Sequence, residues 1–236
     1  LLRLPGHVPM PAFRDVIDVP LVVRKARRSR DQVRQDLGIP LQSHVVVFIY
    51  GGQPPGGDWR LEEDCLPEGW ICIVCSAGKP PGDKPLPSRN FILAEEDAYT
   101  PDLIAASDVC LGKIGYGTTS ECLAHSIPLV FTRRDFFNEE PFLRKLLEVH
   151  GAAVEIRRRD FLGGNWTPYL ERALSLLPIR YDQPTDGAQV VARLLGEAVE
   201  EWRRNGGRDT TTGTTTISPS SLSPPRGEGE FHHLDG

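Results

Sequence analysis

The sequence lacks long apolar runs and any excess of positive charge. No hydrophobic stretch approaches the ~18 residues of a membrane span, and no charged-then-apolar secretory leader is recognisable. With 27 Lys and Arg against 32 Asp and Glu, the formal net charge is −5, which disfavours a general binder of nucleic acid or of anionic membranes. We therefore expect a soluble, globular, cytoplasmic protein. Because the first residue is not Met, the sequence leaves two interpretations open, a fragment or an incomplete gene model.

Cysteine is scarce, and its spacing does not make a recognisable metal site. Cys72 and Cys75 form a CxxC, but they lie in the strand-like segment WICIVCS, where residues i and i+3 project to opposite faces. No second CxxC or His pair completes a ligand set, and His232 and His233 fall in a polar tail. We therefore predict that the chain binds no metal. We also predict that the cysteines are free thiols, most of them buried, in a protein of a reducing compartment. The five cysteines are Cys65, Cys72, Cys75, Cys110 and Cys122.

Two familiar nucleotide-binding patterns are absent as well. There is no GxGxxG followed by an acidic strand end and no GxxxxGK[ST], so both NAD binding and a P-loop are disfavoured. What is present, between Val109 and Thr132, is an apolar strand, a glycine-rich turn, a helix beginning near Thr118 and a second apolar strand. That order predicts a βαβ unit with a phosphate-type loop at its first corner. The glycines of the turn are Gly112, Gly115 and Gly117.

The glycine turn and the helix after it are suited to an anion. Glycine lets a ligand approach the main chain, and the free N–H groups of a first helical turn attract a phosphate. Thr118, Thr119 and Ser120 add hydroxyl donors, and Glu121 lies close enough to reach a sugar diol beside the phosphate. A second interpretation stays open. The glycines would then only turn the chain, and Glu121 would be an exposed first-turn residue favoured by the helix dipole.

The rest of the chain alternates strand-length apolar segments with helical segments. Continuous runs such as His44–Tyr50 are typical of central parallel strands. The alternation predicts an α/β fold, a doubly wound parallel sheet with right-handed crossovers, between about Leu41 and Trp202. We expect strands at Val45, Ile71, Phe91, Val109, Leu129 and Ala152, and helices opening near Pro101, Thr118, Asn138, Trp166 and Asp186.

Further candidate residues follow the predicted strands. Gly51, Gly52 and Gln53 form the start of a loop that either approaches a ligand or is only a mobile surface loop. A polar cluster follows the strand that ends at Thr132, and ligands of open α/β sheets bind at such carboxyl ends. The cluster comprises Arg133, Arg134, Asp135, Asn138, Glu139 and Glu140.

A basic stretch precedes the first strand. Arg24–Leu37 is predicted to be a surface helix ended by Gly38. Its basic residues form either a phosphate patch or, as we expect, a solvated helix face. They are Arg24, Lys25, Arg27, Arg28 and Arg30.

The pattern GxGTxxE at Gly115–Glu121, followed by a strand that ends in an acidic-Asn-acidic cluster, resembles the donor-binding half of GT-B glycosyltransferases of the MurG-like kind. Longer segments resemble the glycosyltransferase-like portion of plant-type L-arabinokinases, over most of Pro9 to about Trp202. Those segments are Pro9–Arg24, Asp97–Asp108, Leu111–Glu121, Arg133–Arg144 and Trp166–Ala173.

The resemblance implies a Rossmann-like C-terminal half of a GT-B fold that binds a nucleotide sugar of the UDP type. It assigns no catalytic residue in this chain. The family often has Asp-Gln or Glu-Gln where this chain has Asn138-Glu139, so the sugar contact departs from its pattern. By this resemblance Gly115, Gly117, Thr118 and Thr119 would hold the phosphates, Glu121 the ribose, Asn138 and Glu139 the transferred sugar, and Gly51, Gly52 and Gln53 would approach the diphosphate.

We expect three parts: an extended inter-half arm over residues 1–23, the donor-binding domain over residues 24–204, and a disordered tail over residues 205–236. The resemblance covers one GT-B half, so we expect the N-terminal GT-B half of the family to lie outside this sequence. We expect the same of the kinase domain, because no PxxxGLxSS loop is found here. Two functions stay open. One is a nucleotide-sugar-binding, glycosyltransferase-like domain of an L-arabinokinase-like protein. The other is a non-catalytic sensing or scaffolding domain of a sugar kinase.

Overall fold

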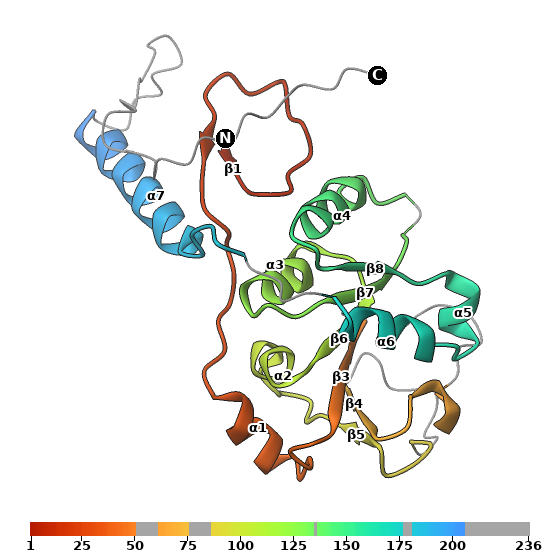
Figure 1. Cartoon of the computed structure of the whole chain (residues 1–236). Helices are drawn as coiled ribbons and strands as arrows, with labels where there is room; N and C mark the ends of the chain where they lie inside the picture. Colours follow the sequence, from red (N-terminus) through yellow and green to blue (C-terminus); the bar gives the residue numbers. More distant parts are fainter. Residues whose placement is uncertain (51–60, 76–85, 135, 177–180, 206–236) are drawn as a thin grey trace. The chain divides into compact units, whose positions relative to one another are not determined.

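The computed structural model describes residues 1–50, 61–75, 86–134, 136–176 and 181–205 (Figure 1). Contacts divide the chain into two units, Leu1–Leu194 and Leu195–Gly236. The first unit contains the N-terminal arm and the α/β domain. Of the second unit, residues 195–205 are described, mainly the last turns of α7 (Gly187–Arg204). The predicted tail lies outside the described residues, apart from Asn205.

A six-stranded parallel sheet forms the centre of the first unit, in the order β5-β4-β3-β6-β7-β8. The four inner strands, β4, β3, β6 and β7, are almost entirely buried, because their mainly apolar residues supply side chains to both faces. This arrangement confirms the predicted doubly wound parallel sheet. The strand bounds are β3 His44–Ile49, β4 Trp70–Val74, β5 Phe91–Leu93, β6 Val109–Lys113, β7 Leu129–Thr132 and β8 Ala153–Glu155.

Helices cover both faces of the sheet (Figure 1). One face packs against α1 (Arg30–Asp36), α2 (Thr100–Ala106), α3 (Tyr116–Ala124) and α4 (Glu140–Val149). The other packs against α5 (Arg158–Leu162), α6 (Thr167–Leu174) and the short helix η1 (Glu63–Cys65). Alternate strand residues serve the two cores: Val45 and Val47 enter the first, and Val46 and Phe48 the second. No helix among the described residues is long and apolar enough to cross a membrane.

The predicted basic helix begins later than expected. Arg24–Leu37 was predicted to be helical throughout, but α1 starts at Arg30. Ser29 sets this start, because its side chain accepts the N–H of Gln32 while the Gln32 side chain accepts the N–H of Ser29. The preceding residues are therefore outside the helix. All five cysteines are free, and each is buried except the half-buried Cys75.

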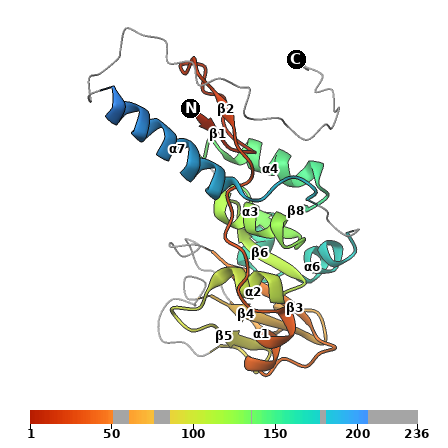
Figure 2. The same cartoon turned by 90° about the vertical axis from the view of Figure 1, so that its left-hand side faces the viewer.

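The arm is closed on itself by a short parallel pair of strands that sequence periodicity could not reveal. β1 (Leu2–Arg3) pairs with β2 (Ile17–Asp18), and the Arg3 guanidinium donates to both Asp18 carboxylate oxygens. Gly6, with φ +73°, lies against α4, where an added Cβ would come within 3.2 Å of Leu143 and 3.1 Å of Leu146. The arm then continues beside α3 and α2 toward α1 (Figure 2).

Candidate functional site

The carboxyl ends of β3 and β6 meet at the point where the strand order reverses. Ile49 pairs with Gly112, so both strands end at the same edge of the sheet. A Cβ on Gly112 would lie 1.8 Å from the Ile49 carbonyl oxygen, which makes glycine obligatory here for close strand contact. Gly51, Gly52 and Gln53, predicted at this edge, lie outside the described residues.

The first turn of α3 has open space in front of its main chain. Gly115 is the N-cap, in extended conformation with φ −164°, and neither it nor Gly117 adopts the left-handed region. No described atom lies within 4 Å of a Cβ added to either glycine. Within the described residues, the N–H groups of Tyr116, Gly117 and Thr118 have no main-chain partner, as expected for a first helical turn. Three N–H donors at the start of α3 are therefore without a main-chain acceptor among the described residues.

The two threonines of this turn differ in access. Thr118 is half-buried, whereas the Thr119 side chain is fully buried and its hydroxyl has no hydrogen-bond partner among the described residues. The Thr119 N–H donates to the Gly115 carbonyl at 2.9 Å. Thr118 is therefore the accessible hydroxyl of the predicted pair.

Glu121 is a buried carboxylate in the second turn of α3. It is 3% exposed, which excludes the exposed-residue interpretation of the sequence. Its Oε1 accepts a hydrogen bond from Arg24 Nε at 2.7 Å, while the Arg24 side chain itself is 59% exposed. No described donor bonds to Oε2. Burial raises the pKa of the Glu121 carboxyl, and the Arg24 guanidinium acts in the opposite direction.

Arg24 belongs to an extended stretch of the arm that is bonded to α3 at every second residue. The Val22 N–H donates to Tyr116 Oη at 3.2 Å, and the Ala26 N–H donates to His125 Nε2 at 3.0 Å. Because Nε2 accepts that bond, the other ring nitrogen carries the proton and donates to the Glu121 carbonyl at 2.8 Å. Between these two main-chain bonds, the Arg24 guanidinium reaches Glu121 on the same helix.

Two cations lie at the same edge without acidic partners among the described residues. Lys113 ends β6, and Arg134 follows β7. Burial lowers the pKa of the Lys113 ammonium, and the neighbouring Arg134 guanidinium lowers it further. Arg134 Nη1 donates to the Ile114 carbonyl at 3.3 Å, and its guanidinium carbon is 3.8 Å from the centre of the Phe137 ring. The bond to Ile114 joins the loops after β6 and β7.

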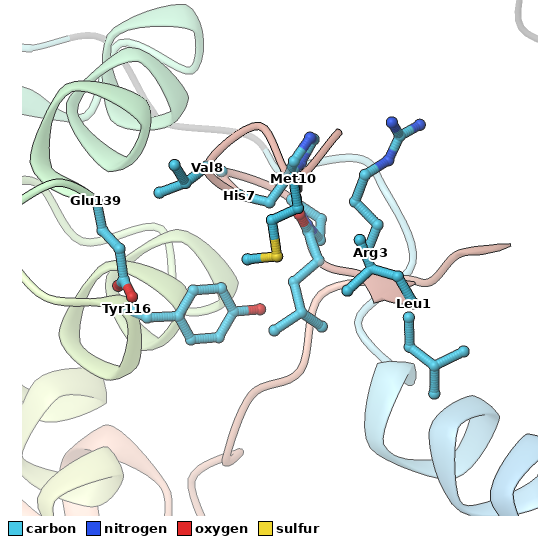
Figure 3. Close-up of a pocket in the computed structure, with 11 residues that line it drawn as sticks. Leu1, Arg3, His7, Val8, Met10, Tyr116 and Glu139 are labelled. Atoms are coloured by element: carbon cyan, nitrogen blue, oxygen red, sulfur yellow. Dashed lines mark hydrogen bonds between the residues drawn. The ribbon is translucent and has the colours of Figure 1, made fainter. Parts of the chain in front are cut away.

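The predicted sugar-facing residues lie where the second of these loops enters α4. Asn138 and Glu139 are exposed, and Glu139 is the N-cap residue without a side-chain capping bond. Glu140 is instead buried, accepting from Arg133 Nε at 3.2 Å and from the Arg134 N–H. Glu139 and Tyr116 line one pocket together with the arm (Figure 3). The glycine turn and the Asn138-Glu139 pair are thus neighbours in space.

Three residues at this edge were missed as site candidates or assigned differently. Arg24 was counted among a solvated helix face, because long-range contact with α3 leaves no local signal. Tyr116 was passed over between two glycines. Lys113 follows the strand directly, in the motif LGKIGYG, and its position at a strand's carboxyl end was the available signal.

Comparison with known proteins identifies relatives of this chain. No family model matches the chain. The chain is 57% identical to L-arabinokinase of Arabidopsis thaliana over 197 aligned residues. The aligned region covers 84% of this chain and 18% of that protein. The chain therefore spans about a fifth of the length of this relative, and the resemblance inferred from the sequence is confirmed.

Solved structures give the fold. The calicheamicin glycosyltransferase CalG4 superposes with a TM-score of 0.51 and 17% identity, over 70% of this chain and 40% of its own. The spinosyn forosaminyltransferase SpnP superposes with a TM-score of 0.51 and 16% identity, over 72% of this chain and 44% of its own. Identities this low establish fold and not activity. The chain thus has a glycosyltransferase-like α/β fold of the GT-B type and is, over most of its length, a relative of one segment of L-arabinokinase.

Proposed function

We propose that this domain binds a nucleotide sugar of the UDP type at the carboxyl edge of its sheet. The observation that carries the proposal is the uncapped start of α3 beside two cations, Lys113 and Arg134, that have no acidic partner among the described residues. Like charges held together cost free energy unless an anion joins them. Free N–H groups and a helix dipole favour an anion at the same place.

The diphosphate would lie against the first turn of α3. The N–H groups of Tyr116, Gly117 and Thr118 would donate to its oxygens, and the open space at Gly115 and Gly117 lets it approach the main chain. Lys113 would add a mobile charge at the end of β6. In this arrangement each glycine of the turn has a role. Gly112 allows close contact with the Ile49 carbonyl, and Gly115 and Gly117 would allow the diphosphate to approach the main chain.

The ribose would lie one turn further along α3. Glu121 Oε2 would accept the hydrogen bonds of the two ribose hydroxyls, while Arg24 holds Oε1 and so fixes the orientation of the carboxylate. Burial of this carboxylate makes each such bond stronger than it would be in water. Asn138 and Glu139 would face the sugar. The choice of uracil rests on the resemblance to GT-B donor halves.

Titration calorimetry with UDP tests the proposal. We expect wild type to bind UDP, and ADP and GDP more weakly. Lys113→Met keeps the length of the side chain and removes its charge, so UDP affinity should fall roughly ten- to a hundredfold, the loss of one charge-assisted hydrogen bond. Lys145→Met, at an exposed position of α4, is the matched control and should bind like wild type. No binding by wild type, or equal binding by Lys113→Met, would contradict the proposal.

A second function is favoured by the similarity itself. The relative at 57% identity is by name a kinase, and this chain spans 18% of it. A nucleotide-sugar pocket kept within such a protein would act as a sensing or scaffolding domain without transfer chemistry. Turnover of a UDP-sugar by the full-length relative would favour transfer, whereas binding with no turnover would favour sensing.

A further inference from the structure

A pocket of ≈ 300 Å³ lies between the arm and the starts of α3 and α4. Tyr116 and Glu139 contribute from the helices, and Leu4, His7, Val8 and Met10 are among the arm residues that line it. In Figure 3 the Tyr116 ring extends from the Glu139 side of the pocket toward the arm. This volume is at the lower end of the range for small-molecule sites.

The arm wall of this pocket is held by interactions on both sides. The pairing of β1 with β2 and the ion pair of Arg3 with Asp18 close the loop that carries the lining residues. Gly6 packs that loop directly on α4. The Val22 N–H holds the Tyr116 hydroxyl at 3.2 Å. The arm residues that line the pocket are therefore packed and hydrogen-bonded as part of the first unit.

The polar groups of the pocket have hydrogen-bonding capacity to spare. Tyr116 Oη accepts from Val22, which leaves its own proton to donate. The Glu139 carboxylate makes no capping bond. His7 Nδ1 lies 3.1 Å from the Leu4 carbonyl and donates to it, so Nε2 of the neutral ring is an acceptor. The remaining lining from the arm is mainly aliphatic.

We propose that this pocket holds the sugar ring of the nucleotide sugar, with the arm as its second wall. The inference rests on the proposed function. In a nucleotide sugar the anomeric carbon is bonded to an oxygen of the second phosphate, so the sugar must lie directly beside the group that binds that phosphate. Tyr116 is that junction, because its N–H faces the phosphate position and its ring lines the pocket.

The lining suits a sugar in particular. A sugar ring has a C–H face that packs on an aromatic ring and hydroxyl groups around its edge, and Tyr116 and Glu139 offer the matching surfaces. Val8 and Met10 cover the ring from the arm side and therefore restrict which sugars fit. Arm residues thus act as determinants of sugar specificity.

The sequence contains a built-in reporter for this pocket, since Met10 is its one methionine. In protein labelled with ¹³C-methyl methionine, the Met10 signal, assigned with Met10→Leu, should stay nearly fixed on saturation with UDP. It should shift on saturation with a UDP-sugar. UDP-glucose, UDP-galactose, UDP-xylose and UDP-arabinopyranose form the panel of ligands.

Calorimetry with a blocked pocket completes the test. At least one of these UDP-sugars should bind wild type roughly tenfold more tightly than UDP, the gain of one good polar contact. Val8→Trp should abolish that advantage and leave UDP binding unchanged, whereas Val16→Trp, elsewhere on the same arm, should preserve both. Glu139→Gln should reduce the advantage without filling the pocket, which covers the case that Val8→Trp does not fold.

The outcomes separate the two proposals. If UDP binds but no UDP-sugar binds more tightly or moves the Met10 signal, the sugar pocket is wrong and the nucleotide site stands. If a UDP-sugar still binds more tightly than UDP in both Val8→Trp and Glu139→Gln, the proposal that this pocket holds the sugar is also wrong. If UDP itself does not bind, both proposals fail.

Discussion

At the residue scale, the proposed site depends most on Glu121. The carboxylate is buried in a helix, has one arginine partner from a distant part of the chain, and keeps one oxygen without a described donor. This oxygen is not one of the fully buried, unpaired side-chain atoms of the described residues, so the ion pair with Arg24 leaves it able to accept a further donor. In the proposed site Arg24 would be a positioning residue, since it bonds to one carboxylate oxygen and opposes the burial that raises the pKa of Glu121.

The raised pKa predicts a pH dependence that belongs to Glu121. The folded-state pKa lies above the ordinary value of 4.5, so the folded protein binds a proton more tightly than the unfolded chain. By linkage, this contribution to stability is complete below the unfolded pKa and is lost as pH rises through the folded pKa. Wild type should therefore lose stability relative to Glu121→Gln over that window. Urea denaturation of both proteins from about pH 4 to pH 8 measures this difference, and parallel curves would contradict it.

At the element scale, the glycine turn contains one glycine in close contact with a neighbouring strand, Gly112, and two with open space around them, Gly115 and Gly117, which the proposal places against the ligand. Gly112→Ala should destabilise the domain by about 1–3 kcal/mol or more, because the new methyl group would meet the Ile49 carbonyl. Gly117→Ala meets no described atom and should raise the free energy of unfolding by up to about 1 kcal/mol through helix propensity. The same methyl group should weaken UDP binding.

Gly196→Ala in α7 serves as the control for that substitution, since it also meets no described atom and should add stability without changing UDP affinity. Thermal unfolding and calorimetry on the three variants give both quantities. A Gly117→Ala protein that is more stable and binds UDP like wild type would remove the first turn of α3 from the site.

The sequence predicted the elements that have strong local signals. Strand β3 reads as a continuous β-branched run, and Pro101, Pro141 and Pro168 each stand in the first turn of a helix. The start of α3 was placed two residues late, because Tyr116 and Gly117 are poor helix formers. Four short elements, β1, β2, η1 and α5, were not predicted, because each is at least half polar and has no apolar run to mark it.

The candidate site was predictable only where its residues are close in sequence. The GxGTxxE turn and the polar cluster after β7 are local patterns, and the strand order brings them to one edge. The contacts of the arm with α3 join residues almost a hundred positions apart, such as Arg24 with Glu121, so no local pattern encodes them. They depend instead on where the fold places the arm beside α3.

At the scale of the whole molecule, one α/β unit with its own arm carries all the described site residues. The chain spans 18% of its L-arabinokinase relative and 40–44% of the two glycosyltransferases that share its fold. Full GT-B enzymes close their cleft with a second half. Here the arm lies against α3 and α4 within the same unit, and in the proposed function this unit provides the nucleotide contacts.

The most direct test compares UDP with 2′,3′-dideoxy-UDP on wild type and on Glu121→Ala. If Glu121 receives the ribose hydroxyls, wild type should prefer UDP by roughly ten- to a hundredfold, the value of a charge-assisted hydrogen bond. In Glu121→Ala the two ligands should bind with nearly equal affinity, because the group that distinguishes them is gone. An equal preference for UDP in both proteins would contradict the account.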